Sequence, residues 1–164
     1  MFENLLNLVR ENAGDAIIKN PVIPNERNDE AISYASNSIV DGLKGAIANG
    51  NINDVLSMFT GGNAAASPVA QNINGGFIQN LMDKFGLDNG QAGGVANNLL
   101  PSILNQFVHK TNDPNDSSFD IQNIMQNLTG GNSGLDIQNI ISQFQVGSHA
   151  GGNGLMDTVK GLFK

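Results

Sequence analysis

The sequence contains no cysteine and no tryptophan, and aromatic residues make up only 5% of its 164 residues. Without cysteine, the chain has no disulfide, no thiolate ligand for zinc and no cysteine nucleophile. With so few aromatic rings, the interior has to be built mainly from aliphatic side chains. Hydrophobic residues still account for 40% of the sequence, and a chain of this length can bury a core as one domain or as two small halves.

Charged residues are also scarce, and most of them are acidic. They make up 14% of the chain, against roughly 25% in an ordinary soluble domain, and 8 basic against 15 acidic residues give a net charge of -7. DNA and anionic lipids attract local positive charge, so this balance opposes nucleic-acid binding, even through a helix-turn-helix-like pair. No run reaches the roughly 18 apolar residues of a membrane span, and Glu3 precedes any base, unlike in a secretory signal. We therefore expect a cytoplasmic protein.

Asparagine, glutamine, serine and glycine take the place of the missing charged residues. The 20 glycines and the many asparagines favour helix ends and turns, because both residue types tolerate the left-handed backbone conformation. This composition has two interpretations. One is a general asparagine preference among the proteins of the source organism, and the other is a weakly charged, hydrogen-bonding surface that suits self-association.

One short motif occurs more than once and has the period of a helix. Residues 52–63 are INDVLSMFTGGN, and residues 121–132 are IQNIMQNLTGGN. In both, apolar residues stand at i, i+3, i+4 and i+7, which places them along one side of a helix. The same spacing recurs in three further segments, the last of them with three of the four positions. The apolar residues are Ile52, Val55, Leu56 and Phe59; Ile121, Ile124, Met125 and Leu128; Ile137, Ile140, Ile141 and Phe144; Phe2, Leu5, Leu6 and Val9; and Met156, Val159 and Phe163.

The residues that flank these segments support the helical interpretation. Asp120 and Asp136 precede the first apolar residue of their segments, where a carboxylate caps a helix N-terminus. Glycines follow Thr60 and Thr129, as a left-handed C-cap requires. Helices this short fall below the roughly 12–15 residues at which an isolated helix becomes even marginally stable. We therefore expect them to bury their apolar sides against one another.

A longer helix is predicted from about 30 to 48, after a stretch with two prolines. Asn28 or Asp29 is the expected N-cap of this helix. Pro21 and Pro24 exclude a helix before it and fix an extended connection. The residues that we expect to face inward are Ile32, Ala35, Ile39, Leu43 and Ile47.

A second longer helix is predicted from Pro68 to the residue before Gly86. Residues 64–68 form the best linker candidate, and proline suits the first position of a helix. Ile73, Phe77, Leu81 and Phe85 have the spacing of an inward side. Gly75 and the glycine after it weaken the middle of this helix, because glycine is a poor helix former.

The third longer helix, from 91 to about 109, is expected at the centre of the fold. Asp88 and Gln91 have the spacing of a capping box, and Pro101 is expected to kink or split the helix near Leu100. No segment shows the sustained alternation of a strand. The sequence therefore predicts an all-α protein: a compact orthogonal array of about eight short to medium helices with no β-sheet.

Residues 84–107, KFGLDNGQAGGVANNLLPSILNQF, resemble the YidB-like family of bacterial proteins. The shared pattern is a Gly-Leu turn, a cap, a helix that contains Ala and Gly, and a Leu-Leu-Pro element followed by an apolar helix. The resemblance covers roughly 70–164 and implies an all-helical fold and a bacterial origin. It transfers no site residue, because the family has no established activity. We accordingly divide the chain into an N-terminal helical segment, 1–66, which packs on a YidB-like domain, 67–164, with one shared core.

Residues that carry chemistry are few. His109 and His149 are the only histidines; we expect both to be exposed, with no zinc site, and no Gly-x-Ser-x-Gly elbow provides a serine nucleophile. Residues 113–124 begin like a calcium loop, but a serine stands at position 6 and an isoleucine at position 12. Residues 147–152 are glycine-rich but lack the lysine and the preceding strand of a phosphate-binding loop. We predict no catalytic, cofactor-binding or metal-binding residue, and no cofactor.

We therefore expect a non-enzymatic helical interaction or self-assembly module, whose partner is another protein or a second copy. One alternative is a peripheral membrane or envelope-associated protein that uses amphipathic terminal helices, because Lys160 and Lys164 lie beside the apolar residues of 154–164. The other alternative is an enzyme or ligand-binding protein with an unrecognised site. No nucleic acid and no particular small molecule is indicated.

Overall fold

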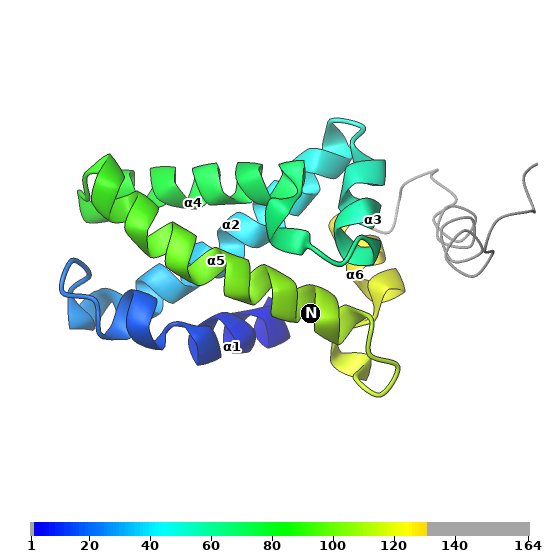
Figure 1. Cartoon of the computed structure of the whole chain (residues 1–164), viewed down its shortest axis with the longest axis horizontal. Helices are drawn as coiled ribbons and strands as arrows, with labels where there is room; N and C mark the ends of the chain where they lie inside the picture. Colours follow the sequence, from blue (N-terminus) through cyan, green and yellow to red (C-terminus); the bar gives the residue numbers. More distant parts are fainter. Residues whose placement is uncertain (1, 131–164) are drawn as a thin grey trace, which may run out of the picture. The chain divides into compact units, whose positions relative to one another are not determined.

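The computed structural model describes residues 2–130, and in this range the chain is helical with no strand, which confirms the all-α prediction (Figure 1). The α-helices are α1 (Phe2–Asn12), α2 (Asn28–Ala48), α3 (Ile52–Thr60), α4 (Pro68–Phe85), α5 (Asn89–Thr111) and α6 (Ile121–Leu128). Between them lie one π-turn, η1 (Gly14–Ile18), and three short 3-10 helices, η2 (Asn25–Arg27), η3 (Ala64–Ala66) and η4 (Ser117–Phe119). The helices predicted within 137–144 and 156–163 lie outside the described residues.

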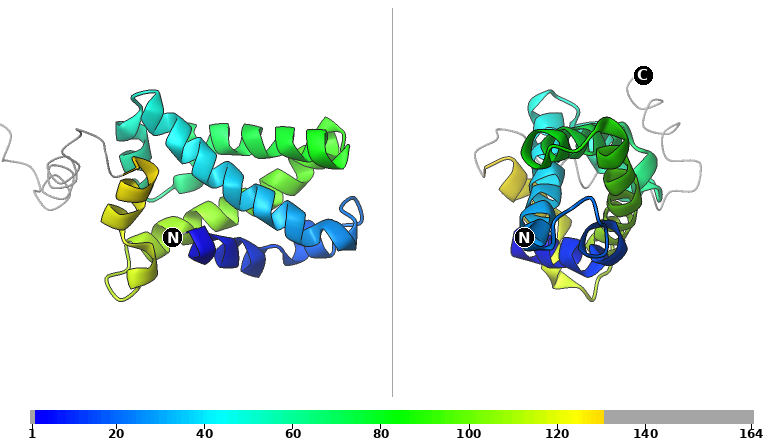
Figure 2. Two further views of the ribbon diagram at one scale, coloured as in Figure 1. Left: turned by 180° about the vertical axis from the view of Figure 1, so that it is seen from behind. Right: turned by 90° about the vertical axis from the view of Figure 1, so that its left-hand side faces the viewer.

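Four of these helices form a closed ring around the core. α2 packs against α1 and α4, and α5 packs against the same two helices, so α2 and α5 lie on opposite sides (Figure 2). The two cross diagonally, with α5 nearer the viewer in Figure 1 and α2 nearer in the reversed view. α3 and α6 lie at one end of the ring. Helices from both sides of the predicted 66/67 boundary thus contribute to the ring, and the boundary itself stays a prediction.

Aromatic side chains join α3, α5 and η4 at that end of the ring. The ring centroids of Phe59 and Phe107 are 5.4 Å apart at 70°, and those of Phe107 and Phe119 are 5.4 Å apart at 79°. Edge-to-face pairs of this kind contribute about 0.5–1.5 kcal/mol each beyond the burial of their area. All three rings are buried, so this aromatic cluster fills the place where three elements meet.

The two short repeats form α3 and α6, and the same positions of both are buried. Ile52 and Ile121 begin the two helices and are half-buried, whereas the later apolar residues of each stripe are buried. Among the residues central to the prediction, Ile124 is 1% exposed, and Ile140 lies outside the described residues. The predicted inward side of the short helices is therefore confirmed for α3 and α6.

The two repeats end alike, but with a shift of one residue. The hydroxyl of Thr60 donates to the carbonyl four residues earlier at 3.0 Å, and that of Thr129 does the same at 2.9 Å. The left-handed residue is Gly62, with φ 75°, in the first copy and Gly130, with φ 71°, in the second. The left-handed glycine thus follows Thr60 by two positions and Thr129 by one. The expected glycine stop is present in both repeats, and its register differs.

The predicted ends of α4 and α5 are also present. Ser67 Oγ accepts the N–H of Ala70 at 3.0 Å, with proline in the first turn, and Gly86 closes α4 with φ 66°. Asp88 Oδ1 accepts the N–H of Gln91 at 2.8 Å, and Gln91 Oε1 accepts the N–H of Asp88 at 3.2 Å. This reciprocal pair confirms the capping box at the start of α5.

The predicted start of α2 is wrong, and of the kink or split expected at Pro101 the split is absent. α5 is continuous through Pro101. α2 begins at Asn28 itself, and its N-cap position is held by Arg27, which has no side-chain oxygen to accept a helix N–H. Instead, the Arg27 guanidinium binds both carboxylate oxygens of Glu30, at 2.8 and 2.9 Å, and lies 4.1 Å above the ring of Phe85. This pair with Arg27 lowers the pKa of Glu30.

Two features of the N-terminal region also differ from the prediction. Phe2 is 44% exposed although it was placed on the inward side, and Leu8 is buried in its stead. Residues 14–18, for which no element was predicted, form η1, where the carbonyl of Ala13 accepts the N–H groups of both Ile17 and Ile18, at 2.9 and 3.0 Å. A segment of five residues is too short to show a helical period, so its sequence gave no signal.

Candidate functional site

Charged residues are unevenly distributed along the chain. No Asp, Glu, Lys or Arg occurs in 55–82 or in 89–109. These two runs cover most of α3 and α4 and nearly all of α5. Because α4 and α5 pack against each other, the fold joins the two uncharged runs on one side of the ring.

The outward residues along this seam have the same spacing on both helices. On each helix they stand at i, i+3, i+4 and i+7, so they lie along one side of it, and all are exposed or half-buried. The two rows are linked where Asn74 Nδ2 donates to Asn97 Oδ1 at 2.8 Å. We call this surface the α4–α5 face. It consists of Gln71, Asn74, Gly75 and Ile78 of α4 and Gly94, Asn97, Asn98 and Pro101 of α5.

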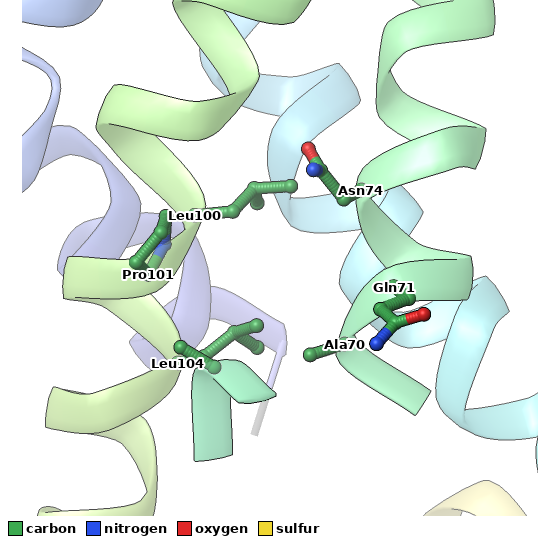
Figure 3. A pocket seen from close by; sticks show the side chains of 7 residues that line it. Ala70, Gln71, Asn74, Leu100, Pro101 and Leu104 are labelled. Carbon is green, nitrogen blue, oxygen red and sulfur yellow. The ribbon is translucent and has the colours of Figure 1, made fainter. Parts of the chain in front are cut away.

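A small cavity of about 60 Å³ lies between the two rows, at the level where the side chain of Asn74 points from α4 toward α5 (Figure 3). Its lining consists of Ala65, Ala70, Gln71, Asn74, Leu100, Pro101 and Leu104. The Oδ1 atom of Asn74 is buried and accepts no hydrogen bond from residues 2–130. Pro101 has no N–H, so the Asn97 carbonyl lacks its usual helical donor. The seam therefore contains two acceptors of this kind. Within the described residues, Asn74 Oδ1 accepts no hydrogen bond, and the Asn97 carbonyl lacks the N–H that residue 101 would normally donate.

Four glycines in the interiors of α4 and α5 are not required by packing within the described residues. A Cβ added at Gly75, Gly76, Gly93 or Gly94 would meet no atom within 4 Å. In a helix interior, each glycine is about 1 kcal/mol less favourable than alanine. These residues therefore lower helix stability without a visible gain inside the fold, and they leave the helix backbone uncovered.

A larger cavity lies elsewhere, at the ends of α3 and α5. It has a volume of about 410 Å³, and a neighbouring one of about 380 Å³ shares its His109 and Asn112. The first is lined by Phe59, Thr60, Gly62, Asn63, Ala64, Asn105, Val108, His109 and Asn112. Asn112 Nδ2 donates to the carbonyl of Phe59 at 2.7 Å and ties the two helix ends together. His109 is exposed, as predicted.

Two carboxylates near His109 accept hydrogen bonds from the backbone of the adjoining turn. Asp113 follows His109 by four residues, which is the spacing of a metal-ligand pair on a helix, and it lines the second cavity with Asp116. Asp113 Oδ1 accepts a backbone N–H at 2.9 Å, and Asp116 Oδ1 accepts the N–H of Ser118 at 3.0 Å. This N–H lowers the pKa of Asp116, and Lys110 at 3.3 Å adds to the effect. The carboxylates at the start of residues 113–124, the stretch that resembles a calcium loop, therefore stabilise the turn between α5 and α6.

The remaining features considered in the sequence lie partly within residues 2–130 and partly outside them. Within residues 2–130, no three His, Cys, Asp or Glu side chains are arranged to hold a metal ion, and none of the helices there has the length and apolarity needed to cross a membrane. His149, the glycine-rich stretch 147–152 and the terminal segment 154–164 lie outside the described residues.

No family model, curated protein or solved structure matches this chain. The resemblance of residues 70–164 to the YidB-like family therefore stays a prediction. The α4–α5 face was not predicted from the sequence, although the two uncharged runs can be read directly in it. Their meeting on one surface depends on the packing of α4 against α5.

Proposed function

We propose that this chain is a non-enzymatic helical interaction module whose contact surface is the α4–α5 face. The observation that carries the proposal is that exposed helical glycines and amide side chains occur together on a surface with no charge. The centres of protein interfaces are depleted in charged residues. Glycine lets another backbone approach closely, and amide side chains offer both donors and acceptors.

The energetics of burial favour this face over the other sides of the ring. Covering a charged group that finds no partner costs several kcal/mol, whereas a neutral amide that re-forms its hydrogen bonds costs little. The surface around α1 and α2 carries charged groups, including the pairs Arg10–Asp29 at 3.3 Å and Asp15–Lys19 at 2.9 Å. A partner therefore has less to desolvate on the α4–α5 face.

The cavity at His109 supports an enzymatic function less well. A general base needs a neighbour that orients it and a nucleophile or substrate proton within hydrogen-bond reach. No hydrogen bond within residues 2–130 involves the His109 imidazole, and Asp113 and Asp116 are engaged by the turn. We therefore place the function on the α4–α5 face and not in the His109 cavity.

The membrane alternative now rests on residues 154–164. α1 cannot present a continuous apolar side to a membrane while Leu5, Leu8 and Val9 are buried in the core. Liposome flotation of the full chain, compared with a chain that ends at residue 153, tests this alternative. Equal flotation of the two removes it. A cytoplasmic location and a bacterial, YidB-like origin remain part of our proposal, supported by the acidic composition and by residues 84–107.

Two variants with the same chemical change test the proposed face. Asn98 lies on the α4–α5 face, Asn37 lies on α2 across the ring, and both side chains are exposed. Affinity capture from an extract of the source organism should retain the same proteins with wild type and Asn37→Glu, and should lose them with Asn98→Glu. Partners that bind Asn98→Glu as well as wild type would show that the contact surface lies elsewhere.

A further inference from the structure

We infer that the α4–α5 face binds a second copy of this chain, in a two-fold pair that brings the two faces together. This inference rests on the proposed function and names its partner. Three properties of the face lead to it: its charge relative to the rest of the chain, its hydrogen-bonding groups and its uncovered helix backbone.

The charge distribution makes this face a place where two copies can meet. With a net charge of -7 per chain, two copies repel each other in most orientations. A different partner chosen by electrostatics would carry positive charge and meet an acidic surface. The α4–α5 face offers no charge for such recognition, but it lets two equally acidic molecules touch without burying like charges.

The hydrogen-bonding groups of the face are self-complementary. A two-fold pair presents the same patch from both sides, so the patch must contain matching donors and acceptors. Gln71 and Asn98 each carry an amide with both kinds of group.

The uncovered backbone allows a close approach. Gly75 and Gly94 lie on the face, and nothing within 4 Å would obstruct a side chain at either. Packed helices are usually 8–10 Å apart, depending on the side chains at the contact. With glycine at the contact, helices of two copies approach more closely and gain dispersion contacts over the backbone. This gives the glycines, which internal packing does not need, a role in the pair.

The dimensions of the face indicate a weak pair. α4 has 18 residues and is therefore roughly 27 Å long, and two helices side by side are roughly 20 Å wide. The area covered is then about 500 Å² per copy, which lies at the lower end of specific interfaces. We accordingly expect a pair that forms in the micromolar to millimolar range and gives a concentration-dependent mass.

Sedimentation equilibrium of the full chain tests the pair. The mean mass should rise from 17.2 kDa toward twice that value with increasing concentration, and it should rise further at higher salt, which screens the repulsion. Asn98→Glu and Gly94→Gln should each weaken the pair at least tenfold. Asn37→Glu and Gly45→Gln, the matched controls on α2, should leave it unchanged. A wild type that stays monomeric at about 1 mM, or an equal loss in the controls, would overturn the inference.

A single thiol identifies what covers the face, since the chain has no cysteine of its own. Asn98→Cys should react with a maleimide more slowly as the protein concentration rises, whereas Asn37→Cys should react at one rate throughout. Slow reaction of Asn98→Cys at every concentration, in a protein that sediments as a monomer, would show that the chain itself covers the face, and would refute the pair. If the chain stays monomeric while capture of another protein still depends on Asn98, the pair is refuted and the proposed interaction module stands.

Discussion

Two glycines three residues apart on α2 should respond in opposite ways to the same substitution. A Cβ at Gly42 would overlap Ile73 Cγ1 of α4 and would lie 3.3 Å from the Cα of that residue, whereas a Cβ at Gly45 would meet no atom within 4 Å. A new rotamer of Ile73 relieves the overlap with Cγ1 but not the approach to Cα. Gly42→Ala therefore has to push α2 and α4 apart, and Gly45→Ala does not.

The expected magnitudes follow from two opposing terms. Replacing glycine by alanine in a helix interior gains about 0.5–1 kcal/mol, in part because the unfolded chain loses freedom. Overpacking a well-packed contact costs about 1–3 kcal/mol. Gly45→Ala should therefore stabilise the protein by about 0.5–1 kcal/mol, and Gly42→Ala should destabilise it by about 1 kcal/mol. Because the helix term is common to both variants, their difference measures the packing cost alone.

Urea unfolding followed by circular dichroism gives these free energies from the midpoint and slope. The expected order of stability is Gly45→Ala, then wild type, then Gly42→Ala. In an Ile73→Ala background, the cost of Gly42→Ala should shrink, because the overlapping Cγ1 is gone. If the two alanine variants are equally stable, or if the cost of Gly42→Ala is the same in both backgrounds, α2 and α4 do not meet at Gly42 as described.

Further variants test the helix ends, the turn after α5 and the proline within it. Asp88→Ala removes the capping box and should cost about 1 kcal/mol in urea unfolding. Asn112→Ala breaks the bond that ties α5 to the last turn of α3 and should also cost about 1 kcal/mol. Asp116 has a folded pKa below its ordinary value of 3.8, so its contribution to stability is present above that pH and is lost as the pH falls through the folded pKa. Asp116→Asn should therefore flatten the part of a stability profile that lies below pH 3.8. Pro101→Ala restores a helical hydrogen bond and should stabilise the chain, by up to about 3 kcal/mol.

The helices that the sequence predicted best are those whose ends are set by neighbouring residues. The capping box at Asp88, the side-chain cap of Asp120 and the left-handed Gly86 each depend on groups within four residues. The spacing of apolar residues is equally local. Such signals fix where a helix begins and ends, and which side of it faces inward, before any partner is known.

The features that the sequence did not predict depend on packing between distant residues. Pro101 was expected to kink or split α5, yet α5 is not split there, and Leu99, Leu100, Ile103 and Leu104 are buried on both sides of it. Burying each such side chain is worth about 1.5–3 kcal/mol, which together exceeds the roughly 3 kcal/mol that an interior proline costs. The order of helices around the ring is equally non-local, because every helix with one apolar stripe can pack against several others.

Only part of the candidate site could be predicted from the sequence, because the rest depends on packing between distant residues. The uncharged runs 55–82 and 89–109 could be found by inspection, and so could the spacing of His109 and Asp113. That Asn74 meets Asn97 across a seam depends on the turn through Gly86 that sets the register of α4 against α5. The carboxylate of Asp113 lies near His109 in the sequence, but its bond to the turn is a property of the folded loop.

The distribution of charge bears on the two interpretations of this composition. A general preference for asparagine over charged residues would act along the whole chain. Residues 2–54, however, contain 12 charged residues, and at that density the runs 55–82 and 89–109 would carry about 11 between them. They carry none, and the fold places the two runs side by side in α4 and α5. A bias that acts uniformly along the chain does not predict this segregation, which supports our proposal that the α4–α5 face contacts another molecule.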